Sequence, residues 1–216
     1  MFEATRREIG NRTLVSRRLL ALVQTLDQSR MLEAAAHKGL IFVQLYGVYE
    51  YAVHSAVQAM LSAIRDEGLS TRDLHHRVLT LVLDGAFTSV AASGRGRSWE
   101  KRLDLVANFE STAPLLSLDN TTFPADGSHY RVKQLQTIWG VFGLDVPVLP
   151  EPRLIGRIEE LVENRNAIAH GRRTPEEVGG RYSASEMDKT ITDIEGVGTY
   201  VVTAMEAHYK RGGVRR

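Results

Sequence analysis

The chain has 216 residues, a formal net charge of +1, 25% charged residues and no cysteine. This composition is typical of a single globular domain, and it excludes a strongly basic protein that coats DNA. The lack of cysteine excludes disulfide frameworks, thiol nucleophiles and thiolate metal sites, and it agrees with a reducing cytoplasm, where we expect the protein. The N-terminus does not resemble a signal peptide, and the most apolar run, residues 39–49, is too short and too polar to span a bilayer, so we expect no membrane partner.

Helical periodicity runs through nearly every long segment, so the sequence predicts an all-α fold. Residues 30–66 predict a long apolar helix that Gly68 ends as a C-terminal cap. Before it, residues 2–27 predict a polar helix with an apolar stripe made of Leu14, Leu19, Leu22, Val23 and Leu26.

The middle of the chain predicts shorter elements. Residues 70–73, Ser-Thr-Arg-Asp, resemble a capping box that opens a helix to about Ala92. A Gly-Arg loop follows at 93–97, and then a short helix over 99–110. Residues 111–129 hold two prolines, one glycine and several Asn, Asp, Ser and Thr residues, and they predict the longest loop.

Three further helices are expected. The first covers about 130–142 and ends at Gly143. The second runs from about 154 to Gly171, whose residue type suits a helix end. The last helix begins at a capping box over 183–186 and continues to about Arg211.

The helix that ends at Gly171 interrupts its own apolar pattern. Its core-facing stripe steps through aliphatic residues of 154–161, and the next step of four lands on Arg165. The neighbouring row reaches Asn166 and then His170. A buried, unpaired guanidinium is very costly, so this polar notch must meet a partner, water or a substrate.

These three side chains suit RNA cleavage that needs no metal ion. His170 can take a proton from a 2′-hydroxyl or return one to the leaving oxygen, because imidazole titrates near neutral pH. Arg165 can hold the phosphate through its fork of donors, and Asn166 can orient His170 or a phosphate oxygen. A structural interpretation stays open, in which arginine and histidine merely complement the C-terminal dipole of the helix.

Two weaker sets of residues accompany this motif. Tyr46 and Glu50 interrupt the long apolar helix one turn apart, and Glu50 can pair with Arg165 or serve only as a structural ion-pair partner. The candidates for binding phosphate or RNA are Arg172, Arg173, Arg95 and Arg97, although a plain solvated loop also explains the last two. We find no P-loop and no metal-ligand spacing, so no metal or cofactor is expected.

The string Arg165-Asn166-Ala167-Ile168-Ala169-His170-Gly171 resembles the Arg-x-x-x-x-His signature of the HEPN superfamily of helical RNases and nucleotide-binding domains. A weaker likeness, over residues 38–50, is to the first core helix of the RiboL-PSP-HEPN and related nuclease families. The resemblance implies one HEPN-like domain over 1–216, with a core of four to five helices. Its parts are an N-terminal helix at 1–28, an insert of helices and loops at about 70–150, and the motif and closing helices at 151–211.

The resemblance also implies an activity. HEPN nucleases form homodimers in which two motifs face each other across a cleft and cleave RNA without metal, leaving 2′,3′-cyclic phosphate ends. It further implies a role in prokaryotic defence or a toxin–antitoxin system, with a nucleotidyltransferase-like antitoxin as partner. Two other interpretations stay open: a non-catalytic HEPN module that binds a nucleotide or a partner, and a helical scaffold.

Overall fold

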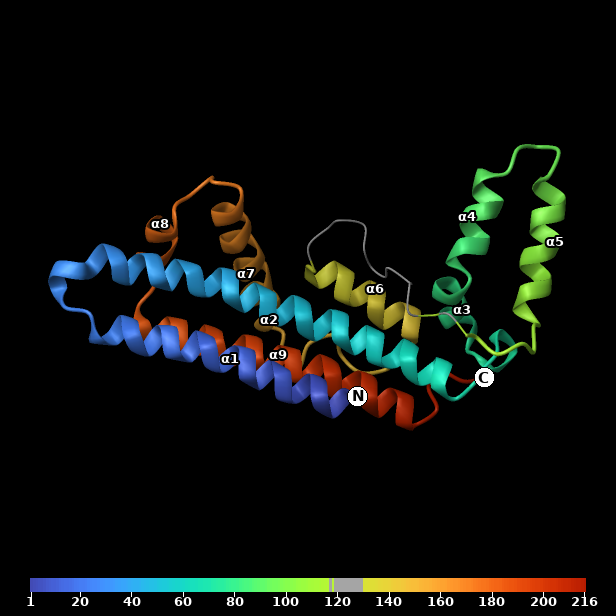
Figure 1. Ribbon diagram of the computed structural model, residues 1–216, viewed down its shortest axis with the longest axis horizontal. Helices are drawn as coiled ribbons and strands as arrows, with labels where there is room; N and C mark the ends of the chain where they lie inside the picture. Colours follow the sequence, from blue (N-terminus) through green and yellow to red (C-terminus); the bar gives the residue numbers. More distant parts are fainter. Residues whose placement is uncertain (117, 119–129) are drawn as a thin grey trace. The chain divides into compact units, whose positions relative to one another are not determined.

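The computed structural model describes residues 1–116, 118 and 130–216, and it confirms the all-α prediction (Figure 1). Within these residues there is no strand, only isolated bridges between Ser70 and Pro114 and between Leu74 and Arg215. Most of the loop predicted at 111–129 lies outside the described residues.

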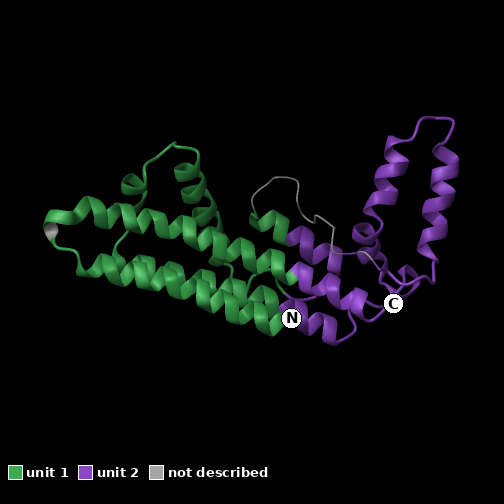
Figure 2. Ribbon diagram, viewed as in Figure 1, with its two compact units in different colours: residues 1–56, 129–135, 147–203 green, residues 57–128, 136–146, 204–216 purple. Residues whose placement is uncertain are grey.

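The chain divides into two compact units (Figure 2). Unit 1 comprises residues 1–56, 129–135 and 147–203, and unit 2 comprises the remainder. The motif helix lies in unit 1, and most of the predicted insert lies in unit 2. The assignment of all 216 residues to a single domain stays a prediction.

Unit 1 is built on α1 (Phe2–Thr25), the first part of α2 (Met31–Asp66) and most of α9 (Ala184–Lys210). Arg17 of α1 binds Asp188 and Glu195 of α9, each at 3.0 Å, which fixes these two helices side by side (Figure 1). The long helix predicted at 30–66 is α2, and its observed bounds agree with the prediction to within one residue.

The predicted stripe of α1 is only partly correct. Val23 is buried as predicted, but Leu14 and Leu22 are exposed, and the buried face carries several small polar residues. Thr13 can be buried because its hydroxyl donates to the Ile9 backbone carbonyl at 2.8 Å, which replaces its hydrogen bond to water. The buried residues of α1 are Phe2, Thr5, Ile9, Thr13, Ser16, Leu20 and Val23.

A short helix, α8 (Pro175–Gly179), packs on the start of α2. A Cβ atom at Gly39 would lie 2.1 Å from the Pro175 carbonyl oxygen, and one at Gly179 would lie 1.9 Å from that of Ala35. Only glycine allows these backbones to approach so closely. No helix is predicted here, although the capping box of Thr174 and Glu177 is a signal that the sequence carries.

Unit 2 departs from the single helix predicted from Ser70 to Ala92. The capping box of Ser70 and Asp73 forms, but it closes the 3-10 turn η2 (Thr71–Asp73). Leu74 then adopts an extended conformation, and the His75 amide donates to the Val214 carbonyl at 2.8 Å. Pairing with the C-terminal segment therefore takes the backbone groups that a continuous helix would use.

The remaining helices of unit 2 are short. They are α3 (His76–Val82), α4 (Asp84–Ala92) and α5 (Ser98–Phe109). The helix α6 (Val132–Phe142) ends before Gly143, whose φ of +72° confirms the predicted stop. No helix among the described residues is both long and apolar enough to cross a bilayer.

Candidate functional site

The motif lies at the end of α7 (Leu154–Ala169), and the helix end is tightly defined. Gly171 adopts a φ of +65°, its amide donates to Ile168, and the Arg172 amide donates to Ala167 at 2.8 Å. This is a Schellman motif, which satisfies the last carbonyl groups of the helix. His170 is the C-cap residue, one position beyond the helix, and its backbone position is therefore fixed.

Arg165 occupies the core-facing row of α7, as the sequence predicts. Its guanidinium carbon lies 4.5 Å from the centroid of the Tyr46 ring on α2, and its Nη1 donates to Asn166 Oδ1 at 2.9 Å. A guanidinium stacked on an aromatic ring keeps its edge donors available to other acceptors. The Tyr46 ring and the Asn166 side-chain oxygen therefore hold the guanidinium of Arg165 in place.

The Tyr46 side chain is almost completely buried beneath Arg165. Burial raises the pKa of the Tyr46 phenol, and the Glu50 carboxylate raises it further, while the Tyr130 backbone and the Arg165 charge oppose this shift. The phenol therefore stays neutral near pH 7. Glu50 itself is exposed, and its pairing with Arg165 stays a prediction.

Asn166 and His170 differ in their surroundings. Asn166 is buried, whereas His170 is exposed. The backbone carbonyl of Asn166 accepts a hydrogen bond from the backbone amide of His170 at 3.0 Å, which is part of the helix end. Positions 165 and 170 are about 140° apart around a helix, so within one chain the two side chains leave α7 in different directions.

Two acidic residues that were not predicted as part of the site, Glu159 and Glu163, lie in line with the motif. Glu159, Glu163, Asn166 and His170 share one flank of α7, at steps of four, three and four. Arg131 forms ion pairs with Glu159 and, at 3.8 Å, with Glu163. Helical projection of 154–170 is the signal that could have found this row.

The predicted phosphate ligands Arg172 and Arg173 lie just past the helix end. Arg172 Nη1 is 2.9 Å from Glu163 Oε1, and both side chains are more than half exposed. Such a surface pair contributes about 0–1 kcal/mol, so a phosphate can displace it. Arg173 is exposed and makes no side-chain hydrogen bond or ion pair with the residues that the structure describes.

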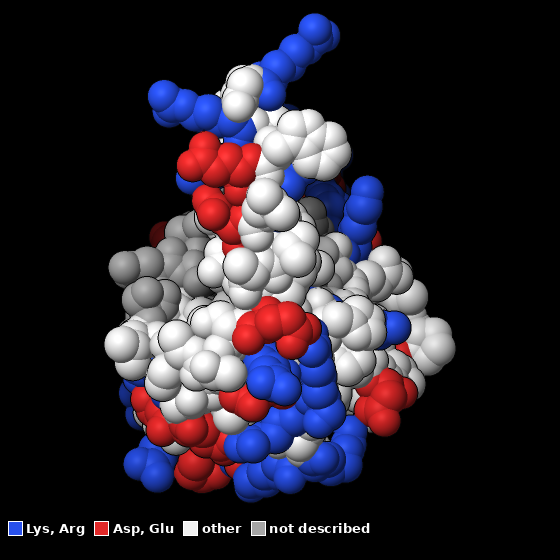
Figure 3. All heavy atoms as spheres, turned by 90° about the vertical axis from the view of Figure 1, so that its right-hand side faces the viewer, with Lys and Arg blue, Asp and Glu red and all other residues white. Residues whose placement is uncertain are grey.

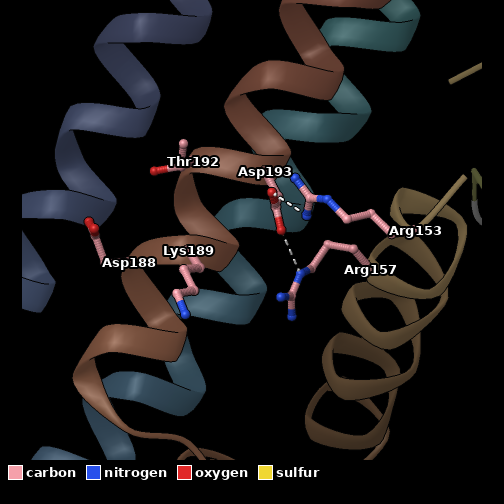
Figure 4. Close-up of a pocket in the computed structure, with 6 residues that line it drawn as sticks. All are labelled: Arg153, Arg157, Asp188, Lys189, Thr192 and Asp193. Carbon is pink, nitrogen blue, oxygen red and sulfur yellow. Dashed lines mark hydrogen bonds and ion pairs between the residues drawn. The ribbon is translucent and has the colours of Figure 1, made fainter. Parts of the chain in front are cut away.

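Two further arginines, at the start of α7, do not belong to this site. Arg153 and Arg157 line a pocket of about 310 Å³ between α7 and α9, and both bind the nearly buried Asp193, at 2.9 and 3.1 Å (Figure 4). Glu160 pairs with Arg157 as well. These carboxylates neutralise the two arginines, and their ion pairs with Asp193 join α7 to α9.

A partly buried network of hydrogen bonds ties the same helix to the turn that follows α8. Asn164, which is 4% exposed, donates to the Tyr182 hydroxyl at 2.8 Å and accepts from Arg181 at 2.9 Å. Tyr182 in turn donates to Glu160 at 2.9 Å and packs its ring 4.8 Å from that of Phe42. This network holds α7 against α2 and so keeps Arg165 over its aromatic partner.

The other predicted phosphate ligands, Arg95 and Arg97, lie in unit 2, in the loop between α4 and α5. Their part in binding phosphate or RNA stays a prediction. Among the described residues, no group of three or more His, Asp or Glu side chains is arranged to hold a metal ion.

The all-helical fold and the polar end of α7 are features of the HEPN class, and comparison with known families agrees. A family model described as MAE_28990-like HEPN matches residues 7–207. The chain therefore belongs to this HEPN family. No curated protein and no solved structure matches the chain.

Proposed function

We propose that the protein is a metal-independent endoribonuclease that cleaves single-stranded RNA at Arg165, Asn166 and His170. The observation that carries the proposal is that one helix end holds both a fixed, partly buried guanidinium and an exposed imidazole. The first can hold a phosphate, and the second can move a proton.

The reaction needs only groups of this kind. The 2′-oxygen attacks the adjacent phosphorus while a base takes its proton, and the bond from phosphorus to the 5′-oxygen breaks. An acid then protonates the leaving 5′-oxygen, so the products are a 2′,3′-cyclic phosphate and a 5′-hydroxyl. Arg165 stabilises the negative charge that the phosphoryl oxygens gain in the transition state.

A homodimer would complete this site. One chain supplies a single motif histidine, whereas the reaction is best served by both a base and an acid. A two-fold axis near the end of α7 would bring in the partner's His170, because an isologous interface places the same surface on both subunits. Sedimentation at micromolar concentration tests this step, and a monomer that still cleaves RNA would contradict it.

The biological setting belongs to the same proposal. HEPN membership supports a role in prokaryotic defence or a toxin–antitoxin system, with a nucleotidyltransferase-like antitoxin as partner. A second candidate function is a HEPN module that binds a nucleotide or partner without cleavage. The ion pair of Glu163 with Arg172 favours it, because this carboxylate lies where RNA phosphates would approach.

One pair of substrates separates the two functions. Purified protein in EDTA is incubated with a single-stranded RNA and with the same RNA carrying one 2′-deoxy residue at the mapped cleavage position. The nuclease cuts the first and leaves that position intact in the second, because the nucleophile is missing. Binding of both without cleavage of either supports the non-catalytic module.

A further inference from the structure

The hairpin of α4 and α5 in unit 2 presents apolar side chains to solvent. Neither helix contains a fully buried residue, and the two are joined by contacts such as Phe87 with Phe109, whose ring centroids are 6.2 Å apart. On α5, Trp99, Leu103 and Val106 form an exposed row at steps of four and three. The indole of Trp99, 72% exposed, lies nearest the tip.

Unneutralised arginines gather at the same tip. The side chains of Arg95, Arg97 and Arg102 make no hydrogen bond or ion pair with any residue that the structure describes. The guanidinium carbon of Arg102 lies 4.9 Å from the centroid of the Trp99 ring. Figure 3 shows this side of the molecule, with basic side chains projecting at the top beside uncharged ones. Arg153, Arg157 and Arg172, in and beside α7, differ because each pairs with a carboxylate.

The nearby carboxylates neutralise only part of the positive charge of the arginines at the tip. Asp104 is bound by Lys101 at 3.3 Å, which leaves Glu100 as the acidic residue next to Trp99. The tip therefore combines an exposed aromatic face with an excess of guanidinium groups. A ligand that matches both features carries repeated negative charges and planar rings that are free to stack, which describes an unpaired nucleic-acid strand.

We propose that the tip of this hairpin binds single-stranded nucleic acid outside the cleavage site. One base stacks on Trp99, and Arg95, Arg97 and Arg102 hold the adjacent phosphates. Nothing in this chemistry depends on a 2′-hydroxyl, so RNA and DNA strands of one sequence bind the tip alike. The inference is independent of the proposed cleavage, since binding here does not require His170.

Tryptophan fluorescence reports on this contact directly. The chain has two tryptophans, and the other, Trp139, is 4% exposed and donates its indole N–H to the Val146 carbonyl. A base that stacks on Trp99 therefore quenches the solvent-exposed part of the emission. We expect saturable quenching when a 12-residue DNA oligonucleotide, which cannot be cleaved by the proposed reaction, is titrated into the full chain.

Substitutions then assign the site. Trp99→Ala should weaken oligonucleotide binding, measured by fluorescence anisotropy, by about tenfold, whereas Trp99→Phe should retain most of it because a ring remains. The double variant Arg95→Ala/Arg97→Ala should lower the salt dependence of log K by about 1.4, since each lost phosphate contact on a single strand removes about 0.7. The matched controls are Leu103→Ala, in the same exposed row, and Arg18→Ala, an exposed arginine of α1.

The outcomes separate this inference from its alternatives. Unchanged affinity in Trp99→Ala, with folding verified by circular dichroism, would overturn it. Equal losses of oligonucleotide affinity in Trp99→Ala and Leu103→Ala, together with a change in the sedimentation of the protein, would instead assign the apolar row to a protein partner. If His170→Ala abolishes RNA cleavage while oligonucleotide binding at the tip persists, both proposals stand. If the protein binds at the tip but never cleaves RNA, only the proposed function fails.

Discussion

The guanidinium of Arg165 lies over the ring of Tyr46, with 4.5 Å between its central carbon and the ring centroid. This contact explains how a helix can place a charged residue on its core-facing row. The face of the Tyr46 ring and the Asn166 oxygen stabilise the positive charge, and the Tyr46 ring itself is buried away from water. The arginine is therefore oriented before any phosphate arrives.

The first prediction concerns this orientation. Arg165→Lys keeps the charge but loses the planar fork and the stacked geometry, so RNA cleavage should fall by about 10²–10³-fold. Tyr46→Phe keeps the ring and should cost about 1 kcal/mol of stability with cleavage largely retained. Tyr46→Ala should cost about 3–5 kcal/mol in chemical unfolding. Equal cleavage by Arg165→Lys and the wild type would show that the stacked arginine is not needed.

Gly171 offers a second test, because its left-handed backbone positions His170. Gly171→Ala should lose about 1–2 kcal/mol of stability and should lose cleavage beyond what partial unfolding explains. Gly156→Ala is the matched control in the same helix, where an added Cβ meets no atom within 4 Å. The control should match the wild type in cleavage and be slightly more stable. If the two variants behave alike in both assays, the helix end does not determine the site.

A third prediction tests the packing of α8 on α2. Gly39→Ala forces a Cβ atom against the Pro175 carbonyl and should destabilise the protein by about 1–3 kcal/mol or more. Gly47→Ala, eight residues further along the same helix, meets nothing within 4 Å and should be stabilising by about 0.5–1 kcal/mol. Thermal unfolding of the two variants should therefore shift in opposite directions. A shift in the same direction would contradict the close approach.

Acid should weaken the start of α9. The Glu186 carboxylate accepts from the Ser183 amide at 2.6 Å, and this hydrogen bond lowers the pKa of Glu186 below its usual 4.5. Because the folded-state pKa is the lower one, the contribution is present above pH 4.5 and is lost as the pH falls through the folded value.

The matching measurement is the urea midpoint at neutral pH, near pH 4.5 and near pH 3. Glu186→Gln should lose part of the decline in stability that the wild type shows over this range. Glu100→Gln, an exposed carboxylate of α5, is the control and should decline as the wild type does. An unchanged acid response in Glu186→Gln would show that this cap does not contribute to the linkage.

Much of the fold follows from local signals. The capping box at Ser183 and Glu186, the stop at Gly143 and the end of α7 at Gly171 all form where the sequence predicts, because each depends on residues within one turn. The single helix predicted from Ser70 to Ala92 does not form, and the reason is not local. Its backbone pairs instead with a segment some 140 residues away, at Val214, which no local pattern reveals.

The candidate site divides in the same way. Arg165 was identifiable because it breaks an apolar period, and Tyr46 because it interrupts a second one. Their stacking could not be predicted, since it depends on how α2 and α7 pack. The pairing of Glu163 with Arg172 was also hidden, because it requires the chain to turn back at Gly171.

The central claim is that the end of α7 cleaves RNA through His170. The most direct measurement is the rate of single-stranded RNA cleavage by purified wild-type protein and His170→Ala, both in EDTA. The account predicts cleavage by the wild type and none by the variant, with equal melting temperatures because His170 is exposed. Cleavage at the wild-type rate by His170→Ala, or wild-type activity that disappears in EDTA and returns with Mg²⁺, would contradict it.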